Sequence, residues 1–139
     1  MNEQENTKTA RRAYELFKAG DIESLLDLYS DDANWETPKI ENMPQGGKRQ
    51  GKQQILEFMS LVGENMENLH FEPREFVAQG DKVVILGDYS WRVKVTGKEY
   101  TSDFVHVCTY GDDGKLTSFK EYLDTAAARD AYTASAQAA

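Results

Sequence analysis

Three glycine-containing dipeptides divide the second half of the chain into segments of strand length, and this spacing constrains the fold more than any other feature. They are Gly80-Asp81, Thr96-Gly97 and Asp113-Gly114. Glycine readily takes the positive φ that two-residue hairpin turns require, so each dipeptide marks a reversal between antiparallel strands. The sequence therefore predicts a four-stranded meander after Leu69.

The first half of the chain has the periodicity of amphipathic helices. Apolar residues recur every three or four positions between residues 7 and 19, and again after a glycine stop and an aspartate N-cap at Gly20-Asp21. We expect this second helix to run to Tyr29. A third helix is predicted from the spacing of Ile55, Phe58, Met59, Val62 and Met66.

A short strand and a long loop separate these helices. Residues 33–37 form the predicted strand and carry Trp35, whereas residues 38–51 contain two prolines and three glycines and are expected to form a loop at the rim of a site. The alanine-rich tail after residue 125 is expected to be a short helix or frayed. At 139 residues the chain suits one core. We therefore predict a single α+β domain over residues 1–139, with a curved antiparallel sheet packed on three helices.

Charge and cysteine content narrow the classes of partner. The formal net charge of −8 opposes binding to nucleic acid or to anionic lipid. The single cysteine, Cys108, allows no intramolecular disulfide, which favours a reducing compartment. The N-terminus is polar and the longest aliphatic run is only Val83-Val84-Ile85-Leu86, so we expect no membrane association and a cytoplasmic location.

The predicted turns also fix which residues face one another across the sheet. Two-residue loops place His106 opposite Glu121, Gly87 opposite His106 and Arg74 opposite Gly87, all on one face. Aromatic and aliphatic residues surround this row, so we place the helices and an apolar pocket against it, with open space beside Gly87. The other face is mixed, and its Val and Leu residues are a candidate dimer contact.

His106 and Glu121 are the leading candidates for catalysis. A carboxyl group and an imidazole that share apolar surroundings are suited to proton transfer, although a buried structural pair without a substrate is the alternative. A second candidate pair is Asp103 and Asp124, because opposed carboxylates share a proton; alternatively, both lie near strand ends in solvent. The chain has two histidines, no metal-binding spacing and no phosphate loop, so no metal or cofactor is predicted.

The remaining candidates are large side chains expected to surround the pocket and to contact an apolar small molecule. For most of them a purely structural place in the core is the alternative. They are Tyr14, Phe17, Trp35, Phe58, Tyr89, Trp91 and Phe104, together with Arg74 at the end of the row.

The order of these elements and several local motifs resemble the SnoaL-like polyketide cyclase branch of the ketosteroid isomerase and nuclear transport factor 2-like superfamily. The residues that carry the resemblance are Tyr14-Glu15-Leu16-Phe17, Gly20-Asp21, Asp32-Ala33-Asn34-Trp35, Gly51-Lys52, Gly80-Asp81-Lys82-Val83-Val84, Asp103-Phe104-Val105-His106-Val107, Asp113-Gly114-Lys115-Leu116 and Glu121-Tyr122-Leu123-Asp124. The resemblance implies an α+β cone with a deep apolar pocket, and a homodimer formed through the sheet. The cyclases use an acidic residue on the last strand as acid and base, and Glu121 matches its position, although it replaces the aspartate typical of the cyclases.

From these observations we expect an isomerase or an aldol-type cyclase that moves a proton next to a carbonyl group. Glu121 is the expected acid and base, and His106 the residue that orients or charge-balances it. Two alternatives remain: a non-catalytic protein that binds a hydrophobic metabolite, and a dimeric interaction module whose pocket is filled by its own side chains.

Overall fold

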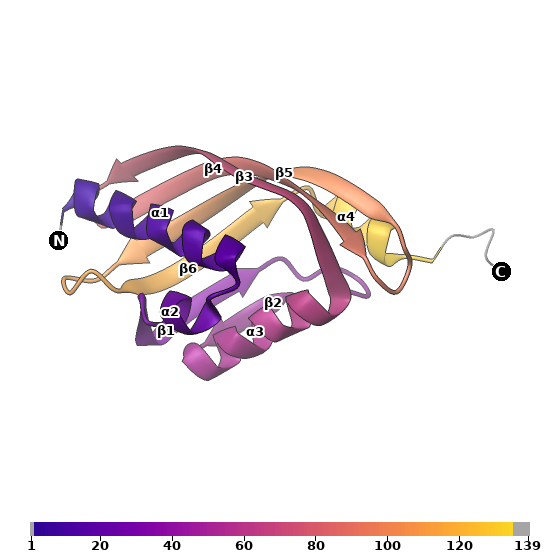
Figure 1. Ribbon diagram of the computed structural model, residues 1–139, viewed down its shortest axis with the longest axis horizontal. Helices are drawn as coiled ribbons and strands as arrows, with labels where there is room; N and C mark the ends of the chain where they lie inside the picture. Colours follow the sequence, from indigo (N-terminus) through magenta and orange to yellow (C-terminus); the bar gives the residue numbers. More distant parts are fainter. Residues whose placement is uncertain (1, 135–139) are drawn as a thin grey trace.

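The computed structural model describes residues 2–134, which form a curved six-stranded sheet with helices on its concave side (Figure 1). The helices are α1 (Glu3–Ala19), α2 (Ile22–Leu26), α3 (Lys52–Asn65) and α4 (Thr125–Tyr132). The strands are β1 (Tyr29–Thr37), β2 (Gly47–Gln50), β3 (Met66–Gln79), β4 (Lys82–Val93), β5 (Glu99–Tyr110) and β6 (Leu116–Leu123).

The strands lie in the order β2-β1-β6-β5-β4-β3. In Figure 1 the long strands β3, β4 and β5 arch over α1, α2 and α3, and α4 lies near one end of the arch. This arrangement confirms the predicted α+β fold. One detail of the prediction is wrong: β1 and β6 pair in parallel, so the sheet is mixed rather than wholly antiparallel.

Gly20 and Asp21 act at the end of α1 and the start of α2 as the sequence predicts, whereas α1 begins at Glu3, four residues before the predicted start at residue 7. Asn2 accepts a hydrogen bond from the Glu5 amide (2.8 Å), and Gly20 ends α1 in the left-handed region with φ of 75°. Asp21 caps α2 by accepting from the Ser24 amide. Helix α2 is shorter than expected and ends at Leu26, because Tyr29 already belongs to β1.

The hairpin at Gly80-Asp81 has the predicted register at its turn, and the hairpin at Asp113-Gly114 has it only from Thr109 and Ser118 onward, because a bulge between Thr109 and Tyr110 shifts the pairing next to the turn. Gln79 pairs with Lys82, and His106 pairs with Glu121. The turn between β4 and β5 is longer than predicted: the Val93 amide donates to the Lys98 carbonyl (2.8 Å), which leaves a four-residue loop. The pairing therefore shifts by two residues. Because side chains alternate between the faces of a strand, an even shift leaves every residue on its predicted face.

A bulge in β3 overturns the predictions for Arg74 and Gly87. The register shifts between Pro73 and Glu75, so Gly87 pairs with Pro73 instead of Arg74. On its other side Gly87 pairs with Phe104 instead of His106, because the longer turn between β4 and β5 shifts that pairing by two residues. Arg74 is pushed out of the row, and its Nε donates to Asp88 Oδ1 (2.6 Å) on an exposed surface. The expected open space beside Gly87 is absent, because a Cβ atom there would lie 2.5 Å from Cζ of Phe104.

The loop predicted over residues 38–51 contains a strand. Strand β2 pairs antiparallel with β1 and places Arg49 opposite Trp35. The remaining loop, residues 38–46, contributes Met43 and Gln45 to the interior. The tail forms helix α4 up to Tyr132, and its last residues lie outside the described part of the chain.

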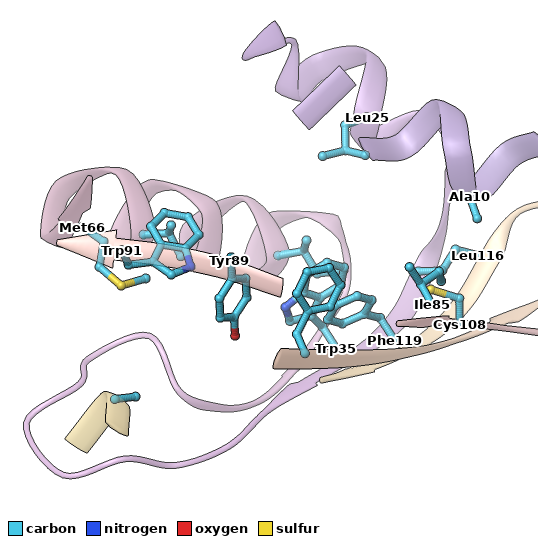
Figure 2. Packing of buried hydrophobic residues seen from close by; sticks show 14 of the residues in the cluster. Ala10, Leu25, Trp35, Met66, Ile85, Tyr89, Trp91, Cys108, Leu116 and Phe119 are labelled. Carbon is cyan, nitrogen blue, oxygen red and sulfur yellow. The ribbon is translucent and has the colours of Figure 1, made fainter. Parts of the chain in front are cut away.

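The core lies between the helices and the concave face of the sheet (Figure 2). In Figure 2 Ala10 and Leu25 come from the helical side, and Trp35, Ile85 and Phe119 from the sheet. Burial of each large apolar side chain contributes roughly 1.5–3 kcal/mol. Among residues 2–134 no helix is long and apolar enough to cross a membrane.

Candidate active site

A cavity of about 110 Å³ lies between the concave face of the sheet and helices α1 to α3. Its walls are mostly aromatic and aliphatic, and helices, strands and the 38–46 loop all contribute. Eight of the predicted site residues line it: Tyr14, Phe17, Trp35, Phe58, Tyr89, Trp91, His106 and Glu121.

His106 and Glu121 meet in the wall of this cavity. Nε2 of His106 lies 2.8 Å from Oε2 of Glu121, across neighbouring strands β5 and β6. His106 is 4% exposed and the Glu121 side chain 14% exposed. The structure therefore places the imidazole and the carboxyl group in contact on the concave face, as the register argument predicted.

Two tyrosines extend this contact into a chain of hydrogen bonds. The Tyr14 hydroxyl lies 2.6 Å from His106 Nδ1, and the Tyr89 hydroxyl donates to Glu121 Oε2 at 3.2 Å. Burial raises the pKa of both phenols far above the usual tyrosine value, and the negative charge of Glu121 adds to the effect. Both hydroxyl groups therefore remain protonated at neutral pH and act as donors.

The proton positions follow from this network. If Tyr14 donates to Nδ1 of His106, the imidazole carries its proton on Nε2 and donates it to Glu121. Oε2 of Glu121 thus accepts from both His106 and Tyr89 and acts as a carboxylate oxygen. Within residues 2–134 no protein group hydrogen-bonds Oε1, so this oxygen is free to act as a base toward a molecule in the cavity.

The second predicted pair is not part of the cavity. Pairing between β5 and β6 ends at Phe104 and Leu123, after which Asp124 caps α4 by accepting from the Ala127 amide (3.1 Å). Asp103 pairs instead with Asp88, and both Asp103 and Asp124 are exposed. Both carboxylates are therefore in solvent, as the alternative expected, although Asp103 lies within β5 and only Asp124 lies at a strand end.

Two other candidates lie outside the cavity wall. Phe104 is 1% exposed and stacks on the His106 ring with 4.3 Å between ring centroids, so it supports the imidazole from behind. Arg74 points to the exposed surface, as described above.

The sequence did not identify several residues that do line the cavity. Phe71 faces the cavity because the bulge at Arg74 reverses the faces of the preceding residues of β3. No local sequence pattern predicts this bulge. Met43 and Gln45 come from an irregular loop, where no periodicity indicates direction. Gln45 is completely buried, and its Nε2 donates to the Tyr132 hydroxyl (2.8 Å), which ties the loop to α4.

Cys108 also lines the cavity, but in a form unsuited to nucleophilic chemistry. The thiol is buried, and burial raises its pKa to about 12, so it stays protonated at neutral pH. In the described range no three side chains of His, Cys, Asp and Glu gather as a metal site would require. The groups arranged for chemistry are therefore the imidazole, the carboxylate and their two tyrosine partners.

The sequence matches a known protein family. The model of the SnoaL-like domain family matches residues 10–119. No protein with a curated description matches the sequence significantly.

Solved structures of similar fold cover almost the whole chain. A nuclear transport factor 2-like protein from Burkholderia xenovorans is 32% identical, with a TM-score of 0.87, over 96% of this chain and 99% of that one. The protein TerC, co-crystallised with polyporic acid, is also 32% identical, with a TM-score of 0.82, over 92% and 98% of the two chains. A protein from Mesorhizobium loti described as a SnoaL-like polyketide cyclase shares the fold at 24% identity and a TM-score of 0.71, over 88% and 99% of the chains.

Proposed function

The chain belongs to the SnoaL-like domain family, and we propose that it is an acid–base enzyme that moves a proton next to a carbonyl group of an apolar small molecule. The observation that carries this proposal is the His106–Glu121 hydrogen bond in the wall of an apolar cavity, with Glu121 Oε1 unpartnered among residues 2–134. The co-crystallisation of TerC, which is 32% identical to this chain, with polyporic acid supports a small organic molecule as ligand.

In the proposed reaction Oε1 of Glu121 removes a proton from the carbon next to the carbonyl group. The electron pair of the broken C–H bond moves into the carbonyl group and gives an enolate. In an isomerase the proton on Glu121 returns at another carbon. In an aldol-type cyclase the enolate carbon instead attacks a second carbonyl carbon, the C=O electron pair moves onto its oxygen, and the resulting alkoxide takes the proton from Glu121. Apolar surroundings favour the transfer, because water is excluded from the carboxylate.

His106 and Tyr89 have a positioning role in this scheme. Their hydrogen bonds to Oε2 hold the carboxylate so that Oε1 faces the cavity, and Tyr14 holds the imidazole in turn. Arg74, Asp103, Asp124 and Phe104 have no place in it, because none of them lines the cavity in the described part of the chain.

The substitution Glu121→Gln tests the proposal with a compact ketone as probe. In D₂O the wild-type protein should accelerate exchange of the benzylic protons of 2-indanone for deuterium, measured by proton NMR. Glu121→Gln should reduce the protein-catalysed rate by at least about a hundredfold, because loss of a general base costs 10² to 10⁴ in rate. Gln keeps the shape of the side chain and its acceptor oxygen, so circular dichroism and the urea midpoint should stay close to those of the wild type.

The matched control is Glu75→Gln, which neutralises an exposed carboxylate on β3. This variant should exchange 2-indanone at the wild-type rate. Equal rates in Glu121→Gln and the wild type would remove Glu121 from the mechanism. Saturable binding of 2-indanone without any exchange above buffer would instead favour the non-catalytic binding protein.

A further inference from the structure

Two buried hydrogen-bonding atoms in the cavity wall have no protein partner among residues 2–134: Nε1 of Trp35 and Oε1 of Gln45. Trp35 is 4% exposed and Gln45 is completely buried. Leaving a buried polar atom without a hydrogen bond costs about 1–3 kcal/mol, so such atoms in a binding cavity point to a polar group on the ligand.

Trp35 lies close to the acid–base pair in the sheet. It pairs with Phe119 across β1 and β6, and the two rings stack with 3.8 Å between centroids. Glu121 is two residues beyond Phe119 and on the same face of β6. In Figure 2 the indole nitrogen of Trp35 is on the edge turned toward the side where Tyr89 lies, away from Phe119.

Indole N–H is a donor only, so its partner must be an acceptor. A carbonyl oxygen is a strong uncharged acceptor, and it is the group that the proposed reaction requires on the ligand. Trp35 and Glu121 lie on adjacent strands and line the same cavity, so one ligand can contact both side chains.

We infer that Trp35 Nε1–H binds the carbonyl oxygen of the substrate and that Gln45 binds a hydroxyl group elsewhere on the same molecule, which makes the ligand class a hydroxylated ketone with an otherwise apolar body. This inference rests on the proposed function and names its substrate class. A hydroxyl group satisfies the Gln45 amide whichever way the amide is oriented, since it both donates and accepts. The Nε2 of Gln45 is already bonded to Tyr132, which fixes the amide at the cavity wall.

Binding of a matched pair of probes tests the role of Trp35 without any need for turnover. The probes 2-indanone and indane differ only in the replacement of C=O by CH₂. Wild-type protein should bind the ketone more tightly, and Trp35→Phe should lower ketone affinity about three- to tenfold while changing indane affinity less than twofold. Trp91→Phe removes the other tryptophan of the cavity and should leave the ratio of the two affinities unchanged.

The indole proton reports on the same contact in the unmodified protein. The chain has two tryptophans, so a ¹⁵N–¹H spectrum shows two indole signals, which Trp35→Phe assigns. The Trp35 signal should move downfield on addition of 2-indanone and not on addition of indane. Equal affinity for both probes, or a ketone-induced shift confined to Trp91, would overturn the inference and leave the acid–base proposal standing.

The contribution of Gln45 is tested with 4-hydroxy- and 5-hydroxy-2-indanone. At least one of them should bind the wild type more tightly than 2-indanone does, and Gln45→Met should remove that gain. If neither hydroxyl group improves binding, the assignment of Gln45 is wrong. Failure of all these ketones to bind would contradict both this inference and the proposed function, whereas binding without proton exchange would contradict only the latter.

Discussion

Glu121 uses its two carboxylate oxygens in different ways. Oε2 is held by His106 and Tyr89, and Oε1 is left for the cavity. The cavity wall around the carboxylate is mostly apolar. The main polar groups there are the two donors to Oε2, from His106 and Tyr89, and Oε1 itself. Such a division is what a base requires, because a carboxylate with both oxygens fully bonded has little capacity to accept another proton.

Gly87 leaves room for the Phe104 ring, which packs against His106. A Cβ atom there would lie 2.5 Å from Phe104, whose ring in turn stacks on His106. We predict that Gly87→Ala destabilises the protein by about 1–3 kcal/mol, measured as a lower urea midpoint, because the backbone of β3 blocks the other direction.

Gly63 provides the matched control for this substitution. It lies within α3, and nothing comes within 4 Å of the Cβ position. Gly63→Ala should therefore raise stability by up to about 1 kcal/mol, because alanine is the better helix former. An equal and small effect of both substitutions would show that the space beside Gly87 is open after all.

Among the secondary structure elements, α4 is joined to the loop over residues 38–46 by a buried hydrogen bond. The Tyr132 hydroxyl accepts from Gln45 Nε2 at 2.8 Å, and both residues are buried. We predict that Tyr132→Phe costs about 1–3 kcal/mol of stability, because it leaves the buried Nε2 without a partner. Tyr122→Phe, on the 48% exposed Tyr122, should change stability by less than about 0.5 kcal/mol. Equal effects of the two would contradict this account of the loop.

The meander and the contact between His106 and Glu121 were predictable because hairpin turns carry a strong local signal. Gly80-Asp81 gave the register of β3 against β4 near the turn, and Asp113-Gly114 brought His106 to Glu121. The Thr96-Gly97 loop has four residues, but its error of two positions left the faces intact. The alternation of side chains along β4 and β5 thus gave the correct face of the sheet, even though the predicted cross-strand partners were two residues away from the observed ones.

Features that depend on tertiary contacts were not predictable in this way. The bulge at Arg74 removed that residue from the row and brought Phe71 inward. Strand β2 forms because residues 47–50 meet β1, although their own sequence reads as loop. Gln45 is buried by its bond to α4, which lies far away in the sequence.

For the complete molecule, the buried phenols and thiol predict sensitivity to alkali. Burial raises the pKa of Tyr14, Tyr29, Tyr89, Tyr100 and Tyr110 above the ordinary value of 10.0, and that of Cys108 from 9.0 to about 12. The unfolded chain releases these protons at lower pH than the folded protein. Stability is therefore full below about pH 9 and is lost as the pH rises further.

Urea unfolding at a series of pH values checks this prediction. The midpoint should be constant between about pH 7 and pH 8 and should fall steeply above about pH 10. Absorbance of ionised tyrosine should show that the buried phenols titrate together with unfolding, while exposed Tyr122 titrates in the folded protein. A midpoint that does not change up to about pH 11 would contradict the assigned burial of these groups.

The convex face of the sheet supports a proposal about assembly. It carries Val77 and Tyr122, which are 54% and 48% exposed, beside the partly buried Val84, Leu86, Val105 and Val107. We propose that two copies pair through this face, because exposed apolar side chains on neighbouring strands form a self-complementary patch. Light scattering should give twice the chain mass of 15.7 kDa, and Val77→Lys should reduce it to one chain. A wild-type mass of 15.7 kDa would contradict the proposal.

The central claim is that a ketone lies in the cavity with its acidic carbon against the free oxygen of Glu121. A crystal structure of Glu121→Gln with 2-indanone tests it most directly, because the variant keeps the cavity and halts the reaction. We predict the ketone between the sheet and α1, with a benzylic carbon about 3–3.5 Å from the side-chain atom that replaces Oε1. Electron density for the ketone only outside the cavity, or with both benzylic carbons turned away from residue 121, would contradict the account.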